Sequence, residues 1–164
     1  MKTNSDFGMA VHTLLIIHEY SKTQKVTSVL IAEVLGTNPV LVRNLIGKLK
    51  KAGFIAVAPR KEKAGTTMAR SLADITVLAV FEAVEPDYVN LLLAPSIRFS
   101  KHSYTGMYVN EMITDYINTA VCSIRASLGS ITLADTLAAL EKKEADSPYE
   151  NPRALFTQPP NAFT

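Results

Sequence analysis

The sequence has little cysteine, no tryptophan and no long apolar run. Cys122 is the only cysteine among the 164 residues, so no disulfide can form within the chain, and such usage is typical of the reducing cytosol. A membrane-spanning helix needs about 18 or more apolar residues in succession, and no run reaches that length. The apolar stretch MAVHTLLII follows Asp6 rather than basic residues, which favours a core helix over a signal peptide. We therefore predict a cytoplasmic protein without a membrane partner.

The groupings of side chains that enzymes and metal sites require are also missing. There is no glycine-rich loop of the kind that holds phosphate groups. His12 and His18 are six positions apart, which places them on different parts of a helix surface, and His102 is distant from both along the chain. The sequence thus predicts no catalytic residue, no metal site and no cofactor.

Positive charge is concentrated in one part of the chain. Residues 37–70 hold eight Lys or Arg and a single acidic residue, Glu62, whereas the remaining residues hold nine basic and fourteen acidic ones. The net charge of the whole chain is only +2, so the distribution of charge is more informative than its sum. Such a concentrated positive region favours a polyanionic partner.

Two short helices joined by a glycine are predicted at the start of this basic region. Residues 5–20 and 28–35 have the apolar spacing of helices, with Thr27 as the cap of the second helix and Gly36 as its end. In the next stretch, TNPVLVRNLIGKLKKAGF, apolar residues again recur at helical spacing, while four residues are Arg or Lys and none is acidic. Two helices joined by so short a turn predict a helix-turn-helix.

The second of these helices has the side chains of a DNA-reading helix. A helix fits the major groove of DNA, where Arg43 can contact guanine, and Asn38 or Asn44 can contact adenine. Val40 or Leu41 can contact a thymine methyl group. The alternative is a cationic helix face that is merely solvated. The predicted contact residues are Thr37, Asn38, Pro39, Val40, Leu41, Arg43, Asn44 and Lys48.

A hairpin is predicted directly after the helix-turn-helix. Residues 54–58 and 67–72 have the composition of two strands around the turn-rich, basic tip PRKEKAGTT. A hairpin in this position predicts a wing that contacts phosphate groups or the minor groove, and an ordinary exposed turn is the alternative. The predicted wing contacts are Arg60, Lys61, Lys63 and Gly65.

A long helix is predicted over residues 106–128, after a further helix from Val77 to Val84. Its apolar stripe extends over about twenty residues, or roughly 30 Å, which is more surface than a small winged helix covers. We predict that a second copy of the chain covers it, and packing within its own chain is the alternative. The predicted dimer residues are Val109, Met112, Ile113, Tyr116, Ile117, Ala120, Val121, Ile124 and Leu128.

The stretches IAEVLGTNPVLVRNLIGKLKKAGFI, DITVLAVFEAVE and ITLADTLAAL, in this order around the long helix, resemble the Rrf2 family of bacterial transcription regulators. The resemblance covers most of residues 5–140, and it implies a homodimer that binds palindromic promoter sites. Several relatives hold an iron–sulfur cluster through three cysteines before the long helix, but residues 86–104 contain no cysteine, so no cluster is expected. The effector, whether a small molecule or a redox signal, is left open.

Two departures from the family pattern concern the DNA-contacting segments. Gly65 is the one glycine of the wing, where many relatives have several, and Arg43 stands where some relatives have an acidic residue. The operator sequence is therefore not expected to match theirs.

The predicted fold class is mainly α with a small β-hairpin wing. Residues 1–85 are predicted to form a winged helix-turn-helix DNA-binding domain, residues 86–145 a linker loop and dimerisation helices, and residues 146–164 a flexible proline-rich tail. The predicted function is a DNA-binding transcriptional regulator, most simply a repressor. The alternatives are a winged-helix module that binds another protein, and a thiol-sensing regulator that uses Cys122.

Overall fold

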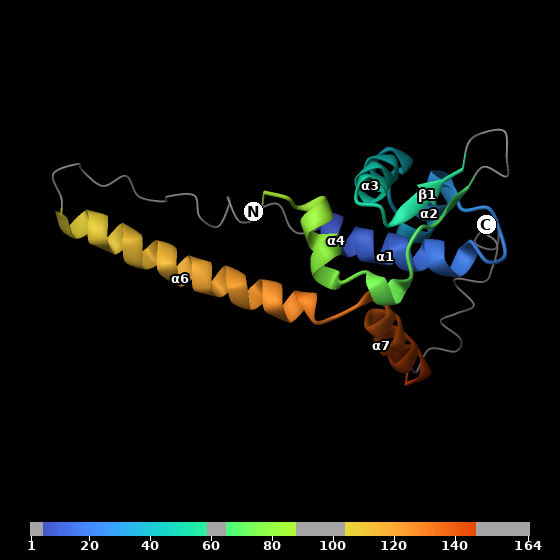
Figure 1. Cartoon of the computed structure of the whole chain (residues 1–164). Coiled ribbons are helices and arrows are strands. Elements are labelled where there is room, and N and C mark those ends of the chain that lie inside the picture. The colour runs from blue at the N-terminus through green and yellow to red at the C-terminus, as the bar shows by residue number, and fades with distance from the viewer. Residues whose placement is uncertain (1–4, 59–64, 88–103, 147–164) are drawn as a thin grey trace.

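The computed structural model describes residues 5–58, 65–87 and 104–146 (Figure 1). These residues form a mainly helical fold with one two-stranded antiparallel sheet, which confirms the predicted fold class. The predicted wing tip, most of the predicted linker and nearly all of the predicted tail lie outside the described residues. The elements are α1 (Ser5–Tyr20), α2 (Ser28–Leu35), α3 (Pro39–Lys51), β1 (Ile55–Val57), β2 (Thr66–Met68), the 3-10 helix η1 (Leu72–Asp74), α4 (Val77–Val84), α6 (Tyr104–Gly129) and α7 (Leu133–Ala145).

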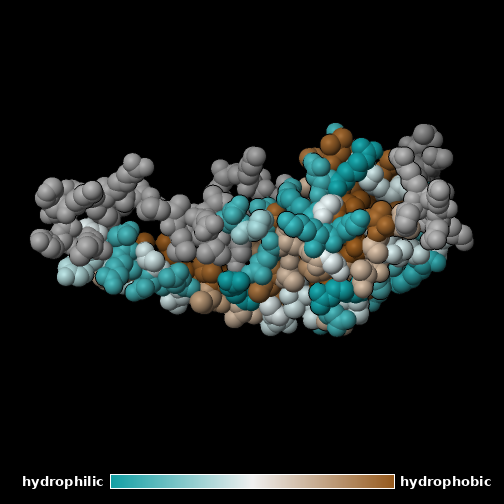
Figure 2. Space-filling model, turned by 45° about the horizontal axis from the view of Figure 1, so that its top comes forward, coloured by the Kyte–Doolittle hydropathy of each residue, from teal (hydrophilic) through white to brown (hydrophobic). Residues whose placement is uncertain are grey.

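Helix α6 extends away from the body of the fold (Figure 1). Its C-terminal part lies against α4, where Val121 is buried and Arg125 Nη2 lies 2.7 Å from Glu82 Oε1. Both hydrophobic and hydrophilic side chains are visible at the surface of this part of the molecule (Figure 2). The predicted long helix is therefore present, and most of it has no cover from the described residues of its own chain.

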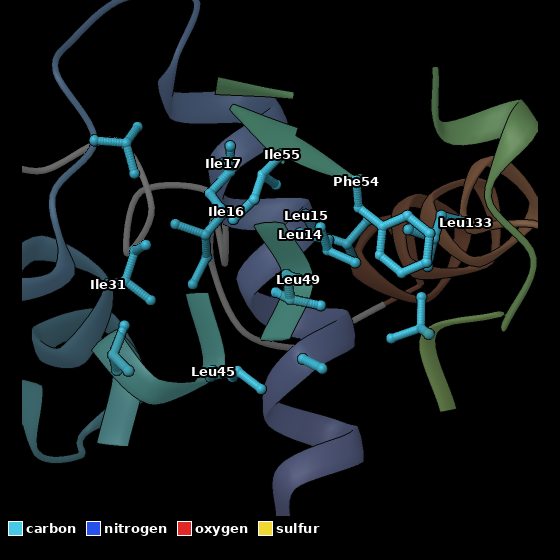
Figure 3. Close-up of a cluster of buried hydrophobic side chains, with 14 of the residues drawn as sticks. Leu14, Leu15, Ile16, Ile17, Ile31, Leu45, Leu49, Phe54, Ile55 and Leu133 are labelled. Carbon is cyan, nitrogen blue, oxygen red and sulfur yellow. The ribbon is translucent and has the colours of Figure 1, made fainter. Parts of the chain in front are cut away.

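Helix α1 lies at the centre of the fold and contacts α2, α3, α4, α7 and β2. Five consecutive residues of α1, from Thr13 to Ile17, are buried. Residues on opposite sides of a helix are buried together only when neighbours surround it. Figure 3 shows the apolar part of this core, in which the labelled residues are Leu14, Leu15, Ile16, Ile17, Ile31, Leu45, Leu49, Phe54, Ile55 and Leu133.

Side-chain caps explain where the helices begin. Thr27 Oγ1 accepts a hydrogen bond from Leu30 N at 3.2 Å, and Thr76 Oγ1 accepts one from Ala79 N at 3.1 Å. Each such cap contributes about 1 kcal/mol to helix stability. At the start of α7, Thr132 Oγ1 accepts a hydrogen bond from Asp135 N while the Asp135 carboxylate accepts one from Thr132 N, which completes a capping box.

The second strand is shorter than the sequence predicted. A strand was expected over residues 67–72, but β2 ends at Met68 and residues 72–74 form the helical turn η1. Ser71 Oγ accepts a hydrogen bond from Ala73 N at 3.3 Å, which caps this turn. The turn brings Leu72 and Ile75 into the core, where they are 5% and 0% exposed. Burial of these two side chains therefore bends the chain where alternation alone would extend it.

The junction between α6 and α7 is fixed to the segment before α4. Val77 N donates to Ile131 O at 2.8 Å, and Leu133 N donates to Ile75 O at 2.9 Å. The Leu133 side chain is fully buried in the core. From this junction, helix α7 continues to Ala145.

In the part of the chain that the structure describes, no single helix is long and apolar enough to cross a membrane. Only α2 and α3 taken together have that length and composition, and the chain bends by 113° between them. Each of these helices buries one face in the core, with Ile31 from α2 and Leu45 and Leu49 from α3.

Candidate nucleic-acid interface

Helices α2 and α3 form a helix-turn-helix. Their axes differ by 113°, within the range of about 90–120° that is typical of this motif. Gly36 has a φ of 62°, and Thr37 N donates to Ala32 O at 2.9 Å across it. Because an L side chain rarely adopts this backbone conformation, glycine allows the tight turn between the helices. The turn holds α3 at a large angle to α2 and on the outside of the fold (Figure 1).

One face of α3 is buried and the opposite face is open. Val42, Leu45 and Leu49 are buried, as the sequence predicted from their spacing. Val40 and Leu41 are 54% and 51% exposed at the start of the helix. The outward face of α3 is defined here as the exposed residues Val40, Leu41, Arg43, Asn44, Gly47, Lys50 and Lys51. Five of the eight predicted contact positions are exposed, and four of these five lie on this face.

Asn38 has a structural role at the start of α3. Its Oδ1 accepts a hydrogen bond from Val40 N at 2.7 Å, and Pro39 occupies the first position of the helix. A two-point contact with adenine needs both the oxygen and the nitrogen of the amide. Because the Asn38 oxygen already accepts the capping hydrogen bond, Asn44 is better placed than Asn38 for such a contact. From the sequence alone, either Asn38 or Asn44 was a candidate for the adenine contact.

Lys48 lies between the open and the buried faces of α3. Its Nζ donates to Asp6 Oδ2 at 3.1 Å and to Val84 O at 3.0 Å. These contacts link α3 to the start of α1 and to the end of α4. The sequence grouped Lys48 with the DNA-contacting residues, but the structure directs its ammonium group away from the outward face. Asp6 is too far away along the chain for a local pattern to reveal this pair.

The base of the wing is a short antiparallel ladder. Ile55 pairs with Met68, Ala56 with Thr67, and Val57 with Thr66. Ala58 N donates to Gly65 O at 3.0 Å and thereby extends the ladder by one step. The sheet lies beside α3 (Figure 1).

The predicted wing contacts divide into two groups. Arg60, Lys61 and Lys63 lie outside the described residues. Gly65 lies at the base, where an added Cβ would be 3.3 Å from Lys25 Cγ. This is a tight contact, so Gly65 is placed to pack against the segment before α2 rather than to approach a ligand.

The predicted dimer residues of α6 are exposed toward its free end. Val109, Met112, Ile113 and Tyr116 are between 41% and 60% exposed, and Ile124, which is nearer to α4, is 40% exposed. The sequence missed Tyr108, which is 59% exposed, although its spacing from Met112 would have placed it beside the stripe. Toward the α4 end, Val121 is buried, while Ile117 and Leu128 are half-buried and Ala120 is exposed. Among the described residues, the chain's own cover of the stripe is thus partial and lies where α6 packs against α4.

The remaining candidate side chains do not form a reactive or metal-binding group. Cys122 is exposed on α6. His12 is half-buried in α1, and burial lowers its pKa. Within residues 5–58, 65–87 and 104–146, no three His, Cys, Asp or Glu side chains are arranged to hold a metal ion.

Comparison with protein families gives one model that covers most of the chain. Residues 3–139 match the Rrf2 model, which is described as an iron-dependent transcriptional regulator. Two Bacillus subtilis proteins, each named as an HTH-type transcriptional regulator, are similar over part of the chain. YwnA is 38% identical over 82 residues, which are 50% of this chain and 58% of YwnA. YwgB is 34% identical over 85 residues, which are 52% of this chain and 54% of YwgB.

Solved structures resemble a larger part of the chain. A protein from Lactobacillus plantarum described as a transcriptional regulator has a TM-score of 0.70 and 26% identity, over 86% of this chain and 97% of that one. T. potens IscR has a TM-score of 0.60 at 24% identity, over 88% of this chain and 91% of that one, which shows a shared fold. Residues 3–139, which the family model matches, include the helix-turn-helix, the wing base and the long helix.

Proposed function

The chain belongs to the Rrf2 family of transcriptional regulators, and from that premise we propose that it binds operator DNA as a homodimer through the outward face of α3. Members of this family regulate transcription and are not enzymes. The observation that carries the proposal is that the exposed basic and amide side chains of α3 share one open face. A helix presented in this way is suited to enter the major groove.

Within the groove, the N-terminal half of α3 is proposed to read bases. Arg43 supplies the two-point donor that guanine accepts, and Asn44 supplies the donor and acceptor that adenine requires. Val40 and Leu41, both about half exposed, supply apolar contact for a thymine methyl group. Lys50 and Lys51 lie at the other end of the helix, where they are placed to contact phosphate groups.

The wing is proposed to contact the phosphate groups of the DNA backbone. Its base, which is formed by β1 and β2, lies beside α3. Arg60, Lys61 and Lys63 belong to the basic tip of the wing by sequence. Phosphate contacts add affinity for every sequence and weaken steeply as salt rises.

Dimerisation through α6 follows from its exposed stripe. Burial of apolar surface contributes about 25 cal/mol per Å², so a second α6 that covers the stripe is favoured over water. Two-fold pairing presents two copies of α3, which suits a palindromic operator with half-sites about one helical turn apart. A dimer bound across a promoter in the bacterial cytoplasm would block polymerase, and repression is therefore the proposed mode.

The chain is proposed to act without an iron–sulfur cluster, although the family model is described as iron-dependent. Clusters are held by several cysteine thiolates, and this chain has one cysteine, which lies exposed on α6. These residues do not fit a cluster ligated by cysteine. Iron analysis and a visible absorption spectrum after anaerobic purification would test this point, and a cluster spectrum would contradict it.

The proposed function is tested by selecting bound sequences from a random DNA pool and measuring the affinity by fluorescence anisotropy. We expect a two-fold symmetric site and an affinity that falls with salt in proportion to the phosphates contacted, with a slope of about −0.9 per phosphate. Lys143→Ala, which removes an exposed charge on α7, is the control and should leave the affinity unchanged. If no sequence is enriched, the alternative of a protein-interaction module is favoured instead.

A further inference from the structure

A cavity of about 490 Å³ lies between α1 and α7, and none of the described residues that line it belongs to α3. This volume falls in the range of about 300–1,000 Å³ that is typical of small-molecule sites. Helix α7 is held against the core at Leu133, which is fully buried, whereas Leu140, about two turns farther along, is 36% exposed. The cavity is thus the space between the two helices beyond the contact at Leu133.

The walls of the cavity are mainly apolar and lie below the protein surface. Leu15, Ile16 and Tyr20 line it from α1, while Leu137 and Leu140 line it from α7. The three residues of α1 are each 8% exposed or less, although they line the cavity. This wall is therefore part of the hydrophobic core rather than an open helix face, and it is suited to contact the apolar body of a ligand.

The titratable carboxylates and imidazole that line the cavity already have interaction partners. Glu19 Oε1 lies 2.9 Å from Lys22 Nζ, and Glu141 and Glu144 each have a partner as well. His12 also has a partner, and burial lowers its pKa. None of the described residues that line the cavity is Lys or Arg. A charged ligand would therefore lose its hydration here without gaining an unpaired ion of opposite charge.

Two uncharged polar side chains of the cavity wall are still available for a ligand. Tyr20 and Gln24 both line the cavity, and neither side chain makes a hydrogen bond to another described residue. Burial raises the pKa of the Tyr20 hydroxyl, so this group stays protonated and can donate a hydrogen bond. The Gln24 amide is uncharged at any pH at which the protein is folded. Such groups are complementary to an uncharged oxygen atom of a ligand.

We propose that this cavity binds a small uncharged molecule that has an apolar body and one hydroxyl or carbonyl oxygen. The apolar body lies between the leucine and isoleucine side chains of α1 and α7, and the oxygen accepts a hydrogen bond from the Tyr20 hydroxyl. A ligand without the oxygen would cover this donor and leave it without a partner, which is unfavourable. A ligand with an ionised group would lose more, because desolvation of a charge is costlier than that of a hydroxyl. The site is separate from the outward face of α3 and thus adds to the proposed DNA binding.

Calorimetric titration of the full chain in the absence of DNA tests the expected lack of charge. Three probes share one apolar body and differ at one end: 4-phenylbutanol, 4-phenylbutylammonium and 4-phenylbutyrate. We expect the alcohol to bind about tenfold more tightly than either charged probe. Equal or tighter binding of a charged probe, or no binding of the alcohol, would overturn the proposal.

The variant Tyr20→Phe tests the contact with the oxygen, because it removes the hydroxyl and keeps the ring in the wall. It should weaken 4-phenylbutanol by about fivefold, as expected for the loss of one uncharged hydrogen bond. It should not weaken butylbenzene, which has the same apolar body and no oxygen. The matched control Tyr116→Phe removes a hydroxyl from α6, where Tyr116 is 60% exposed, and should change neither probe. An equal loss for both probes, or no loss for the alcohol, would overturn the contact between Tyr20 and the ligand.

A further pair of variants tests the cavity itself. Leu140→Trp places a larger side chain at its edge and should abolish binding of the alcohol. Ile131→Trp adds the same side chain at a residue that is 40% exposed and does not line the cavity, so it should leave binding unchanged. Unaltered binding in Leu140→Trp would overturn the proposal, and so would a change in its sedimenting mass, because a second copy would then cover the cavity. Tighter binding of the alcohol in Leu155→Ser/Phe156→Ser would also overturn it, because residues 147–164 would then be the occupant.

Discussion

Helices α3 and α6 differ in the burial of their apolar side chains. Helix α3 buries Val42, Leu45 and Leu49 and turns its charged and amide side chains outward. Helix α6 leaves Met112 and Tyr116 more than half exposed over most of its length. The described residues of a single copy therefore complete the core around α3, whereas they leave most of the apolar surface of α6 without a cover. This difference in exposed side chains favours a polar, charged partner for α3 and an apolar partner for α6.

The comparison also separates what each surface contributes. In the proposed function, the outward face of α3 would make base-specific contacts, which act one side chain at a time. The stripe of α6 would determine whether two copies of that face are presented together, which would multiply the affinity for a two-part site. The effects of substitutions on DNA binding should therefore differ between the two helices, both in magnitude and in whether sequence preference changes.

The largest effect is expected from a charge placed on the stripe of α6. Ile113 is 48% exposed in the single chain, so Ile113→Glu should fold normally. In a dimer the same carboxylate would be buried without a partner, which is strongly unfavourable. We expect loss of the dimer in analytical ultracentrifugation and a fall in operator affinity on the order of a hundredfold. Glu111→Gln, on the same helix, should leave both unchanged, and an unaltered dimer in Ile113→Glu would place the interface elsewhere.

A smaller effect, but a change in sequence preference, is expected on α3. Arg43→Ala should cost about 1–3 kcal/mol at the one base pair that Arg43 contacts and relax the preference there. Lys51→Ala should weaken binding to all sequences alike and reduce the slope against salt by about one. Binding to a set of single-base operator variants distinguishes the two outcomes. A uniform loss in Arg43→Ala would assign Arg43 to phosphate rather than to a base.

The helices and their starts were predictable because their signals are local. Thr27, Thr76 and Thr132 each cap a helix within three residues, so the signal for each of these starts is contained in the neighbouring sequence. The end of β2 was not predictable, because it depends on Leu72 and Ile75 reaching a core that is built mainly from distant segments. The burial of α1 on all sides has the same cause.

The candidate site was also predictable where the signals are local, and not where they depend on distant residues. Arg43 and Asn44 were placed on the outward face because their spacing from Val42 and Leu45 determines their direction. The roles of Asn38 and Lys48 could not be assigned from the sequence, because each role depends on which atom the side chain hydrogen-bonds to. Asn38 has a local partner in the backbone of Val40, whereas the two partners of Lys48 lie 36 and 42 positions away.

Gly47 offers a test of how closely α3 approaches its partner. It lies within α3 on the outward face, and an added Cβ would meet nothing within 4 Å. Gly47→Ala should therefore raise the unfolding free energy by about 0.5–1 kcal/mol, because glycine is a poor helix former. If the groove contacts the backbone at this point, the same variant should lower DNA affinity. Gly8→Ala, in α1 with equally open space, is the control that should raise stability alone. Unchanged DNA affinity in Gly47→Ala would mean that the helix lies farther from the groove.

The smallest expected effect concerns Lys48, which belongs to neither the buried stripe of α3 nor its outward face. Lys48 and Asp6 have side chains 41% and 44% exposed, so their ion pair is worth less than about 1 kcal/mol. If Lys48 only holds α3 against α1 and α4, then Lys48→Met and Asp6→Asn should lower DNA affinity slightly and to a similar degree. If Lys48 instead contacts phosphate, as the sequence predicted, Lys48→Met should reduce the salt slope, whereas Asp6→Asn should free the ammonium group and raise affinity. We expect the first result, because Asp6→Asn leaves the hydrogen bond from Lys48 Nζ to Val84 O in place and therefore does not release the ammonium group.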